Sequence, residues 1–310
     1  MIYTLTINPS IDYVMELEHL TKGTMNRSTH TYLLPGGKGI NVSQVLNALG
    51  VENVAILPVA GFTGAKLEQL LEGKGIAYDA VKMEQGDTRI NVKVLGEEET
   101  ELNAAGPELS KEEKVRLLTK IDQITDGDFL ILSGSVPAGL GTHFYAEIMA
   151  RLQEKNVQVV VDTIGDNFLN ALKYRPLLVK PNKEELKALF VADTTVDTST
   201  AAKPDTDTDT LELAKKVQKM GARNVLVSLG SDGAFLLTEY GQVFYEKAPK
   251  GKVINTVGSG DSMVAGFMAG VVQKHTLQES LKLGIAAGSA SAFSKNLATI
   301  EEIDALMENL

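Results

Sequence analysis

The sequence contains no cysteine, and this absence excludes disulfides, thiolate metal sites and cysteine nucleophiles. It is compatible with a reducing compartment, so we expect a cytoplasmic protein. Long apolar runs are missing too, because the longest helix-like stretch, Met263 to Val272, is too short to cross a bilayer. Its Gly266 and Gly270 lie one helical turn apart, which favours close packing inside a core. The amino terminus lacks the basic start and apolar run of a signal peptide.

Positive charge is also scarce. Lys and Arg total 30 against 40 Asp and Glu, giving a net charge of -10, which argues against nucleic acid or an anionic membrane as a partner. Any anionic ligand must therefore be met by local basic residues. The four histidines are dispersed and form no His-Glu-x-x-His pattern, which argues against a zinc hydrolase.

The remaining composition, 44% hydrophobic and 23% charged over 310 residues, predicts a water-soluble α/β protein with one domain spanning 1–310. Short β-branched runs alternate with amphipathic ones, which indicates a mostly parallel sheet covered on both faces, with its ligand crevice at the carboxyl ends of the strands. The predicted strands are Tyr3 to Ile7, Val54 to Val59, Phe129 to Leu132, Gln158 to Val161, Leu177 to Val179 and Val225 to Leu229. The predicted helices are Gly39 to Leu49, Ala65 to Glu72, Lys111 to Ile124, Phe144 to Lys155, Glu184 to Phe190 and Leu211 to Met220.

Two other segments depart from this alternation. Residues from about 13 to 35 and from 89 to 103 show two-residue periodicity, which predicts antiparallel strands standing off the main sheet as a small β-lid. Residues 191–210 are rich in Thr, Asp, Ala and Pro and offer little to bury, which predicts a flexible acidic insertion without a binding role.

The turn Gly258-Ser259-Gly260-Asp261 opens into the apolar helix that begins near Met263. Glycines at this position let the backbone approach a ligand, and the first free amides of a helix point at any anion placed there. Asp261 could take a proton from an attacking hydroxyl while the amides of this turn stabilise a transferred phosphoryl group. Taken alone, the motif favours the simpler interpretation of an Asp that caps a helix.

The common phosphate-binding motifs do not match. Lys38 is followed by Gly39, where a Walker A loop needs Ser or Thr, and the residue three after Gly260 is Met263, where the dinucleotide fingerprint needs Gly or Ala. The Gly258-Ser259-Gly260 turn also lacks the flanking residues of a hydrolase nucleophile elbow.

A second glycine-rich helix start suits a sugar or sugar phosphate. Backbone amides and an amide side chain can bind hydroxyls, a carboxylate after a strand can accept from two hydroxyls, and cations can bind a phosphate. Two lid arginines would form a phosphate clamp only if folding brought them together, since solvation is the default for either one. The candidates are Asp12, Arg27, Gly36, Gly37, Lys38, Asn41, Arg89, Asn103 and Ser135.

Two further strand ends suggest a nucleotide and a metal. The segment from Lys180 to Glu185 follows a strand and starts a helix, so its polar groups could lie near phosphate oxygens or hydrated Mg²⁺, although a helix cap also explains them. The candidates for the nucleotide are Lys180, Asn182, Ser228, Gly230, Ser231, Gly233, Val257 and Gly260, and those for the metal are Glu185 and Asp162.

The order of these motifs resembles that of the ribokinase-like, or PfkB, family of carbohydrate kinases over nearly the full chain. Each motif is weak alone, but together they are highly specific. They are Asn8-Pro9-Ser10-Ile11-Asp12, Gly36-Gly37-Lys38-Gly39-Ile40-Asn41, Ser133-Gly134-Ser135-Val136-Pro137, Lys180-Pro181-Asn182, Ser228-Leu229-Gly230 and Gly258-Ser259-Gly260-Asp261.

The resemblance implies a ribokinase-like three-layer α/β/α sandwich with a mostly parallel sheet and a small β-lid. It implies that ATP donates the phosphate, that Asp261 is the catalytic base beside an anion hole of Gly258 to Gly260 amides, and that Glu185 positions Mg²⁺ through water. It further implies a sugar phosphate beneath the lid, and a homodimer formed through the lid. By the same resemblance, the sugar hydroxyls would be held by Asp12, Gly37, Asn41 and Asn103, and the substrate phosphate by Lys38, Arg27 and Arg89.

Within the family, the segments from Thr88 to Lys93 and from Thr100 to Asn103 resemble those of the kinases that phosphorylate O6 of fructose 1-phosphate. Kinases of tagatose 6-phosphate are the nearest alternative, and the minor 6-phosphofructokinases tend to have glycine where Lys38 stands. A non-catalytic sugar-phosphate sensor is disfavoured by the retained Asp261 and Glu185. An aromatic content of 5% without tryptophan argues against a nucleoside or vitamin kinase.

Overall fold

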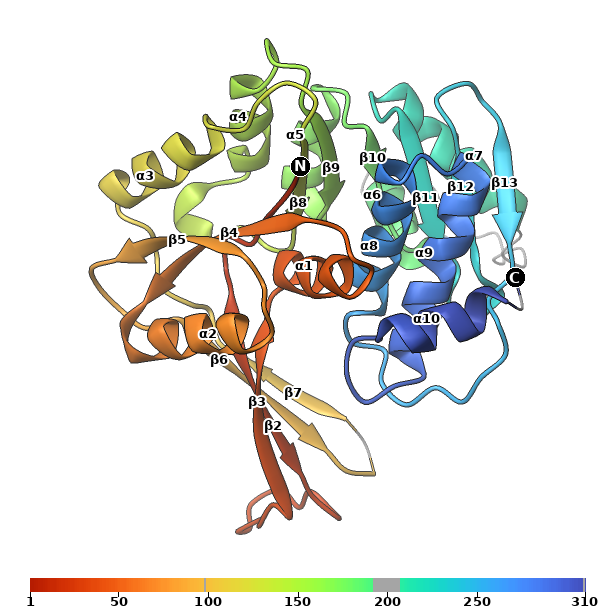
Figure 1. Ribbon diagram of the computed structural model, residues 1–310. Coiled ribbons are helices and arrows are strands. Elements are labelled where there is room, and N and C mark those ends of the chain that lie inside the picture. Colours follow the sequence, from red (N-terminus) through yellow and green to blue (C-terminus); the bar gives the residue numbers. More distant parts are fainter. Residues whose placement is uncertain (98, 192–206, 309) are drawn as a thin grey trace.

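The computed structural model of the protein describes residues 1–97, 99–191, 207–308 and 310 (Figure 1). Its centre is a nine-stranded sheet with the order β13-β12-β11-β10-β9-β8-β1-β4-β5. All neighbours from β11 to β5 are parallel, whereas β12 and β13 are antiparallel to their neighbours. The strands are β1 (Ile2–Leu5), β4 (Asn53–Ala60), β5 (Tyr78–Met83), β8 (Phe129–Ser133), β9 (Gln158–Asp162), β10 (Leu178–Val179), β11 (Asn224–Ser228), β12 (Ala234–Leu237) and β13 (Val243–Glu246).

Helices cover both faces of this sheet, which gives the three-layer sandwich. Strand residues alternate between two cores, because successive side chains of a strand point to opposite faces. One core lies under α1 (Lys38–Ala48), α8 (Ser259–Val272), α9 (Leu277–Ala292) and α10 (Ile300–Met307). The other lies under α3 (Lys111–Ile121), α4 (Phe144–Arg151), α5 (Gly165–Leu172), α6 (Lys183–Val191) and α7 (Asp207–Lys219).

The lid is a separate four-stranded sheet that projects from the body (Figure 1). It has the order β3-β2-β6-β7, and α2 (Gly61–Gly73) packs with its base in a third, smaller core that contains Ile11 and Leu67. Its strands are β2 (Ser10–Glu16), β3 (His30–Gly36), β6 (Arg89–Leu95) and β7 (Thr100–Asn103). Its two hairpins are antiparallel as predicted, but β2 and β6 pair in parallel, a contact that the local periodicity did not predict.

The predicted strands and helices of the body are confirmed within a few residues, including the α/β/α order of layers. The predicted flexible insertion is wrong at its carboxyl end, because residues 207–210 form the first turn of α7. Its central residues, 192–206, lie outside the described residues. Within the described part of the chain, no helix is long and apolar enough to span a bilayer.

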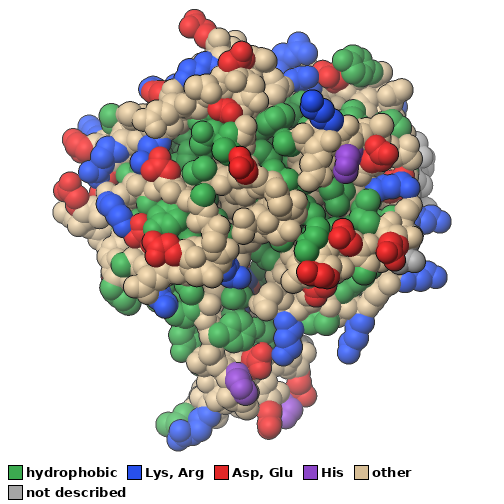
Figure 2. All heavy atoms as spheres, in the orientation of Figure 1, with side chains coloured by type: hydrophobic (Ala, Val, Ile, Leu, Met, Phe, Trp, Pro, Cys, Tyr) green, Lys and Arg blue, Asp and Glu red, His purple; other side chains and the backbone are tan. Residues whose placement is uncertain are grey.

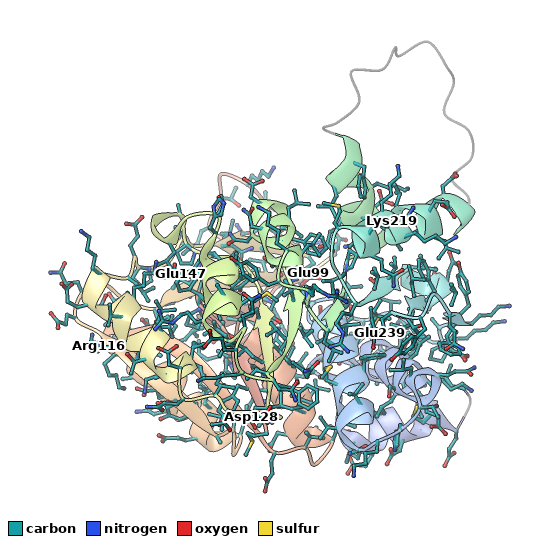
Figure 3. All side chains as sticks on the ribbon, turned by 90° about the horizontal axis from the view of Figure 1, so that it is seen from above. Glu99, Arg116, Asp128, Glu147, Lys219 and Glu239 are labelled. Atoms are coloured by element: carbon teal, nitrogen blue, oxygen red, sulfur yellow. The ribbon has the colours of Figure 1, made fainter. Side chains whose placement is uncertain are left out.

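The surface mixes charges of both signs. Figure 2 shows acidic and basic side chains interspersed over the visible face, without a large area of one sign. Seen from above, the labelled Arg116 of α3 and Lys219 of α7 lie at opposite sides of the molecule (Figure 3).

Candidate active site

The carboxyl ends of three neighbouring strands place polar side chains side by side. Ser133 of β8 pairs in register with Asp162 of β9, and Lys180 follows Val179 of β10, whose partner is Val161. All three side chains therefore share the sheet face that α1 and α8 cover. This edge is the crevice that a parallel sheet offers to a ligand.

Asp261 is the third residue of α8, and Gly258 is the N-cap residue with a φ of 77°. The interpretation of Asp261 as the helix cap is therefore wrong. Its carboxylate, which is 5% exposed, accepts a hydrogen bond of 2.8 Å from Asn41 Nδ2 at the start of α1. The Ser259 amide is used within the turn, where it donates to Thr256 O at 3.2 Å, so an incoming anion would meet the next amides of the helix.

The environment of Asp261 changes its acidity. Burial, followed by the nearby charge of Asp162, raises the pKa of Asp261 to about 6, although Lys38, Asn41 and Lys180 act in the opposite direction. A carboxylate with this pKa is mostly ionised at pH 7 and still basic enough to accept a proton from a hydroxyl.

A buried ion cluster lies next to Asp261. Asp162, 2% exposed, contacts Lys38 Nζ through Oδ2 and Lys180 Nζ through Oδ1, both at 3.4 Å. Burial raises the pKa of Asp162, but the charges of Lys180 and Lys38 outweigh it and lower the pKa overall. The charge of Asp162 in turn raises the pKa of Lys38 above its ordinary value.

The base of the lid carries a second polar cluster, centred on Asp12. Asp12 Oδ1 accepts from Ser10 Oγ at 2.9 Å and from Asn91 Nδ2 at 3.3 Å, and Oδ2 lies 3.0 Å from Lys93 Nζ. Gly36 is required opposite them, since a Cβ there would lie 2.3 Å from Asp12 Oδ1. This cluster borders a cavity of about 370 Å³ that also contacts Asn41, at the hollow where the lid meets the body (Figure 2).

Arg89 stands at the inner end of the lid. Its Nε donates to Asn8 O at 3.2 Å and its Nη1 to Ala104 O at 3.1 Å. It lines a second cavity, of about 310 Å³, together with Lys38, Ser135 and Glu185. An exposed seryl hydroxyl and two cations in one cavity suit a phosphate group.

Arg27 does not join Arg89. Ser10 pairs with both Gly36 and Arg89 at the inner end of the lid, and Arg27 lies beyond the outer end, in the exposed loop between β2 and β3. The expected clamp of two arginines is therefore not formed within one chain. Asn103 ends β7 opposite Asn91 and donates to Glu101 Oε2 at 3.2 Å, so it lies at the exposed rim of the lid.

A third cavity, of about 690 Å³, lies on the other side of the α8 turn. Several predicted nucleotide residues line it: Asn182, Ser228, Gly230, Ser231, Gly233 and Gly260. Lys180 approaches the same turn, because its Nζ lies 3.2 Å from the position of a Cβ at residue 260. Val257 instead lines the cavity under the lid.

The two predicted metal residues differ in their fitness for Mg²⁺. Glu185 accepts from the Asn182 amide at 2.8 Å through Oε2, which leaves Oε1 for a hydrated Mg²⁺ that also binds nucleotide phosphates. Asp162 has both carboxylate oxygens on ammonium groups and does not fit as a ligand in this arrangement. The described residues contain no cluster of three or more acidic or histidine side chains that could hold a metal alone.

Sequence reasoning missed Asn91 and Lys93. Both follow Arg89 at two-residue spacing on β6, so they share its face of the lid. The two-residue alternation therefore indicated that Asn91 and Lys93 lie on the same face of the lid as Arg89. Only the pairing of β2 with β6 shows that Asp12 is their partner.

A buried carboxylate at the start of a helix, near two polar cavities and a larger third one, is the arrangement expected of a small-molecule phosphotransferase. The chain belongs to the pfkB family of carbohydrate kinases, whose match covers residues 5–304. It is therefore a carbohydrate kinase, of a family that uses ATP.

Individual relatives match over nearly their whole length. The chain is 40% identical over 310 residues to a 1-phosphofructokinase of Bacillus subtilis, covering 99% of this chain and 97% of that one. It is 34% identical to a D-tagatose-1-phosphate kinase of Bacillus licheniformis, covering 98% and 96%. The solved phosphofructokinase-2 of Escherichia coli in complex with fructose-6-phosphate superposes with a TM-score of 0.90 at 30% identity, covering 100% and 98%.

Proposed function

We propose that this chain is a hexose-phosphate kinase that transfers the γ-phosphate of ATP to O6 of fructose 1-phosphate, giving fructose 1,6-bisphosphate. The observation that carries the proposal is the Asp261 carboxylate, buried, bonded to Asn41 and set between the substrate cavities and the nucleotide cavity. The names of the 1-phosphofructokinase and tagatose-phosphate kinase relatives support a hexose phosphate as acceptor.

The side chains divide the work as follows. Arg89 and Ser135 bind the phosphate that the substrate already carries, while Asp12 and Asn41, with the Gly36-Gly37 backbone, bind its hydroxyls. Asn103, at the rim, closes over the sugar from the lid. When the sugar phosphate is bound in this way, the hydroxyl at the opposite end from its phosphate lies next to Asp261.

Asp261 then accepts the proton of that hydroxyl as its oxygen attacks the γ-phosphorus. In the Gly258 to Gly260 turn, the amides that are not used within the turn donate to the transferred group, and the dipole of α8 stabilises its charge. Asn182, Ser228 and the Gly230 to Gly233 turn hold the nucleotide in the adjoining cavity. When Mg²⁺ is bound, Glu185 would hold it, and its charge would offset that of the phosphates.

A substrate panel tests the assignment. We expect coupled detection of ADP to show the fastest turnover with fructose 1-phosphate, slower turnover with tagatose 1-phosphate and tagatose 6-phosphate, and the slowest with fructose 6-phosphate. A tagatose phosphate turned over much faster than fructose 1-phosphate would overturn the substrate. The tagatose 1-phosphate arm is included because of the relative at 34% identity.

The Asp261→Asn variant tests the base and the alternative of a non-catalytic sensor. It should bind fructose 1-phosphate and ATP as the unchanged protein does, while kcat falls by about 10²- to 10⁴-fold. A sensor would show no turnover in either protein, and unchanged kcat in the variant would remove Asp261 from the role of base.

A further inference from the structure

Asp162 lies between two cations, and its charge also acts on Asp261. Both oxygens of its carboxylate contact ammonium groups, Lys38 from α1 and Lys180 from the end of β10. Asp162 and Lys180 are 2% and 5% exposed, so water cannot screen their charges effectively. The Asp162 carboxylate balances one ammonium group and the ionised Asp261 carboxylate offsets the other, so the cluster acquires a net positive charge only when Asp261 is protonated.

The two ammonium groups border the place where a phosphoryl group would be transferred. Lys180 Nζ lies 3.2 Å from the position of a Cβ at Gly260, within the proposed anion hole. The stem of Lys38 lies along Gly134, where a Cβ would be 3.5 Å from Lys38 Cβ, and its charge acts on Asp261 as well as on Asp162. Asp162 thus holds two cations whose charges both act on Asp261.

The charge balance of the cluster changes during the reaction. When Asp261 accepts the proton of the attacking hydroxyl, its negative charge is lost, and Asp162 then faces two ammonium groups alone. A dianionic phosphoryl group bound at the Gly258 to Gly260 turn would balance the positive charge that remains. The loss of the Asp261 charge therefore favours the transferred group as the ligand of both lysines.

We propose that Asp162 is a positioning residue, a shared counter-ion that holds the Lys38 and Lys180 ammonium groups against the non-bridging oxygens of the transferred phosphoryl group. The proposal rests on the proposed function, in which Asp261 is the base. It reassigns Lys38, which was expected to bind the substrate's own phosphate, and it removes Asp162 from the set of metal ligands.

The step balances with these groups. The acceptor oxygen forms a bond to the γ-phosphorus, the bond from that phosphorus to the bridging oxygen of ATP breaks, and the electron pair stays on ADP. The hydroxyl proton passes to Asp261. Lys38 and Lys180 keep their protons and only offset the charge that spreads over the equatorial oxygens.

Lys38→Met and Arg89→Leu form a matched pair for a kinetic test, with the best sugar phosphate of the panel as substrate. Lys38→Met should lower kcat by about 10²-fold and change the KM for the sugar phosphate by less than about threefold, because the contact is made to the transferred group. Arg89→Leu should mainly raise that KM. A raised KM with unchanged kcat in Lys38→Met would return Lys38 to the substrate phosphate and overturn the proposal.

Asp162→Asn and Glu185→Gln separate positioning from metal binding. Mn²⁺ binding, measured by electron paramagnetic resonance in the presence of ADP, should be nearly unchanged in Asp162→Asn and weakened by about 10- to 100-fold in Glu185→Gln. Equal weakening in both variants would make Asp162 a metal ligand and overturn the proposal.

The double variant Lys38→Met/Asp162→Asn guards against misfolding of the single one, since it leaves fewer unpaired cations. Because both residues act on one group, its kcat should be no lower than that of the worse single variant. Fully multiplicative losses would contradict the shared role. Failure of the proposed function is recognised separately, by an active Asp261→Asn protein.

Discussion

The carboxylate of Asp261 is held where its charge is unfavourable. Its pKa rises from 3.8 to about 6 because burial and the charge of Asp162 favour the protonated form in the folded state. This cost is absent below about pH 4, where the group is protonated whether the chain is folded or not, and it is complete above about pH 6. About 2 pKa units correspond to about 3 kcal/mol.

Asp261→Asn should therefore raise the free energy of unfolding at pH 8, by about 1 to 3 kcal/mol, while removing turnover. At pH 4, close to the ordinary pKa of an aspartate, the difference should shrink to less than about 1 kcal/mol, which supplies the control within one experiment. Urea unfolding at both pH values measures the difference. A variant less stable than the parent at pH 8 would show that Asp261 supports the fold.

The raised pKa of Asp261 also determines the pH below which activity declines, the acid limb of the pH profile. As the pH falls through about 6, Asp261 becomes protonated and kcat should fall by about tenfold per further pH unit. The hydrogen bond from Asn41 lowers the pKa of Asp261, so Asn41→Leu should shift this limb to higher pH. A pH profile of kcat at saturating substrate measures both, and a limb unmoved in Asn41→Leu would contradict the assignment.

Motif order singled out Asp261 and its glycines at the start of α8, and most of the predicted nucleotide residues line one cavity, while their roles stay predictions. The Lys38, Asp162 and Lys180 cluster was not predictable as a unit, because its members are 124 and 18 residues apart and meet only through strand register and the placement of α1. Arg27 was predicted to bind the substrate phosphate together with Arg89. The length of the lid strands keeps the two arginines apart within one chain, and the role of Arg27 stays a prediction.

At the scale of elements, α8 and α9 pack with unusually close backbones. A Cβ at Gly266 would lie 2.5 Å from Leu283 O and 2.9 Å from Ala287 Cβ. The spacing of Gly266 and Gly270 predicted such close packing, and the geometry confirms it. Because Asp261 lies in the first turn of α8, this contact also fixes the position of Asp261.

Gly266→Ala should lower the free energy of unfolding by about 1 to 3 kcal/mol, since neither backbone nor Ala287 can move away cheaply. Gly73→Ala at the end of α2, where nothing lies within 4 Å of the added Cβ, is the matched control and should gain up to about 1 kcal/mol. Thermal unfolding of both variants measures the contrast. Similar effects from the two substitutions would mean that helix propensity, not packing, determines the change in the free energy of unfolding.

Elements with a clear period were predictable, and those without one were not. The core strands and α1, α3, α4 and α7 follow the periodicity of their apolar residues. The helix α9 was missed because its buried stripe consists largely of Ala, Gly and Ser. The parallel pairing of β2 with β6 joins segments 79 residues apart and has no local signal.

At the scale of the whole molecule, the lid has one polar and one apolar face. Asp12 and Lys93 face the site, and the alternate residues Tyr13, Val92 and Leu102 lie in register on the opposite face. Leu102 is 61% exposed, and the lid projects away from the body (Figure 1). An exposed apolar sheet of this kind suits the same face of a second copy.

We therefore expect a homodimer joined by the lids, as the resemblance implied. Leu102→Glu should shift sedimentation equilibrium toward the monomer, because a carboxylate would be buried in the apolar interface. Val115→Glu is the matched control, since Val115 on α3 is 62% exposed but distant from the lid, and this variant should stay dimeric.

In the Leu102→Glu monomer, a lid without its support should also hold the sugar less firmly, so the KM for the sugar phosphate should rise more than kcat falls. A parent protein that sediments as a monomer, or a Leu102→Glu variant that remains dimeric, would place any contact between copies elsewhere on the surface.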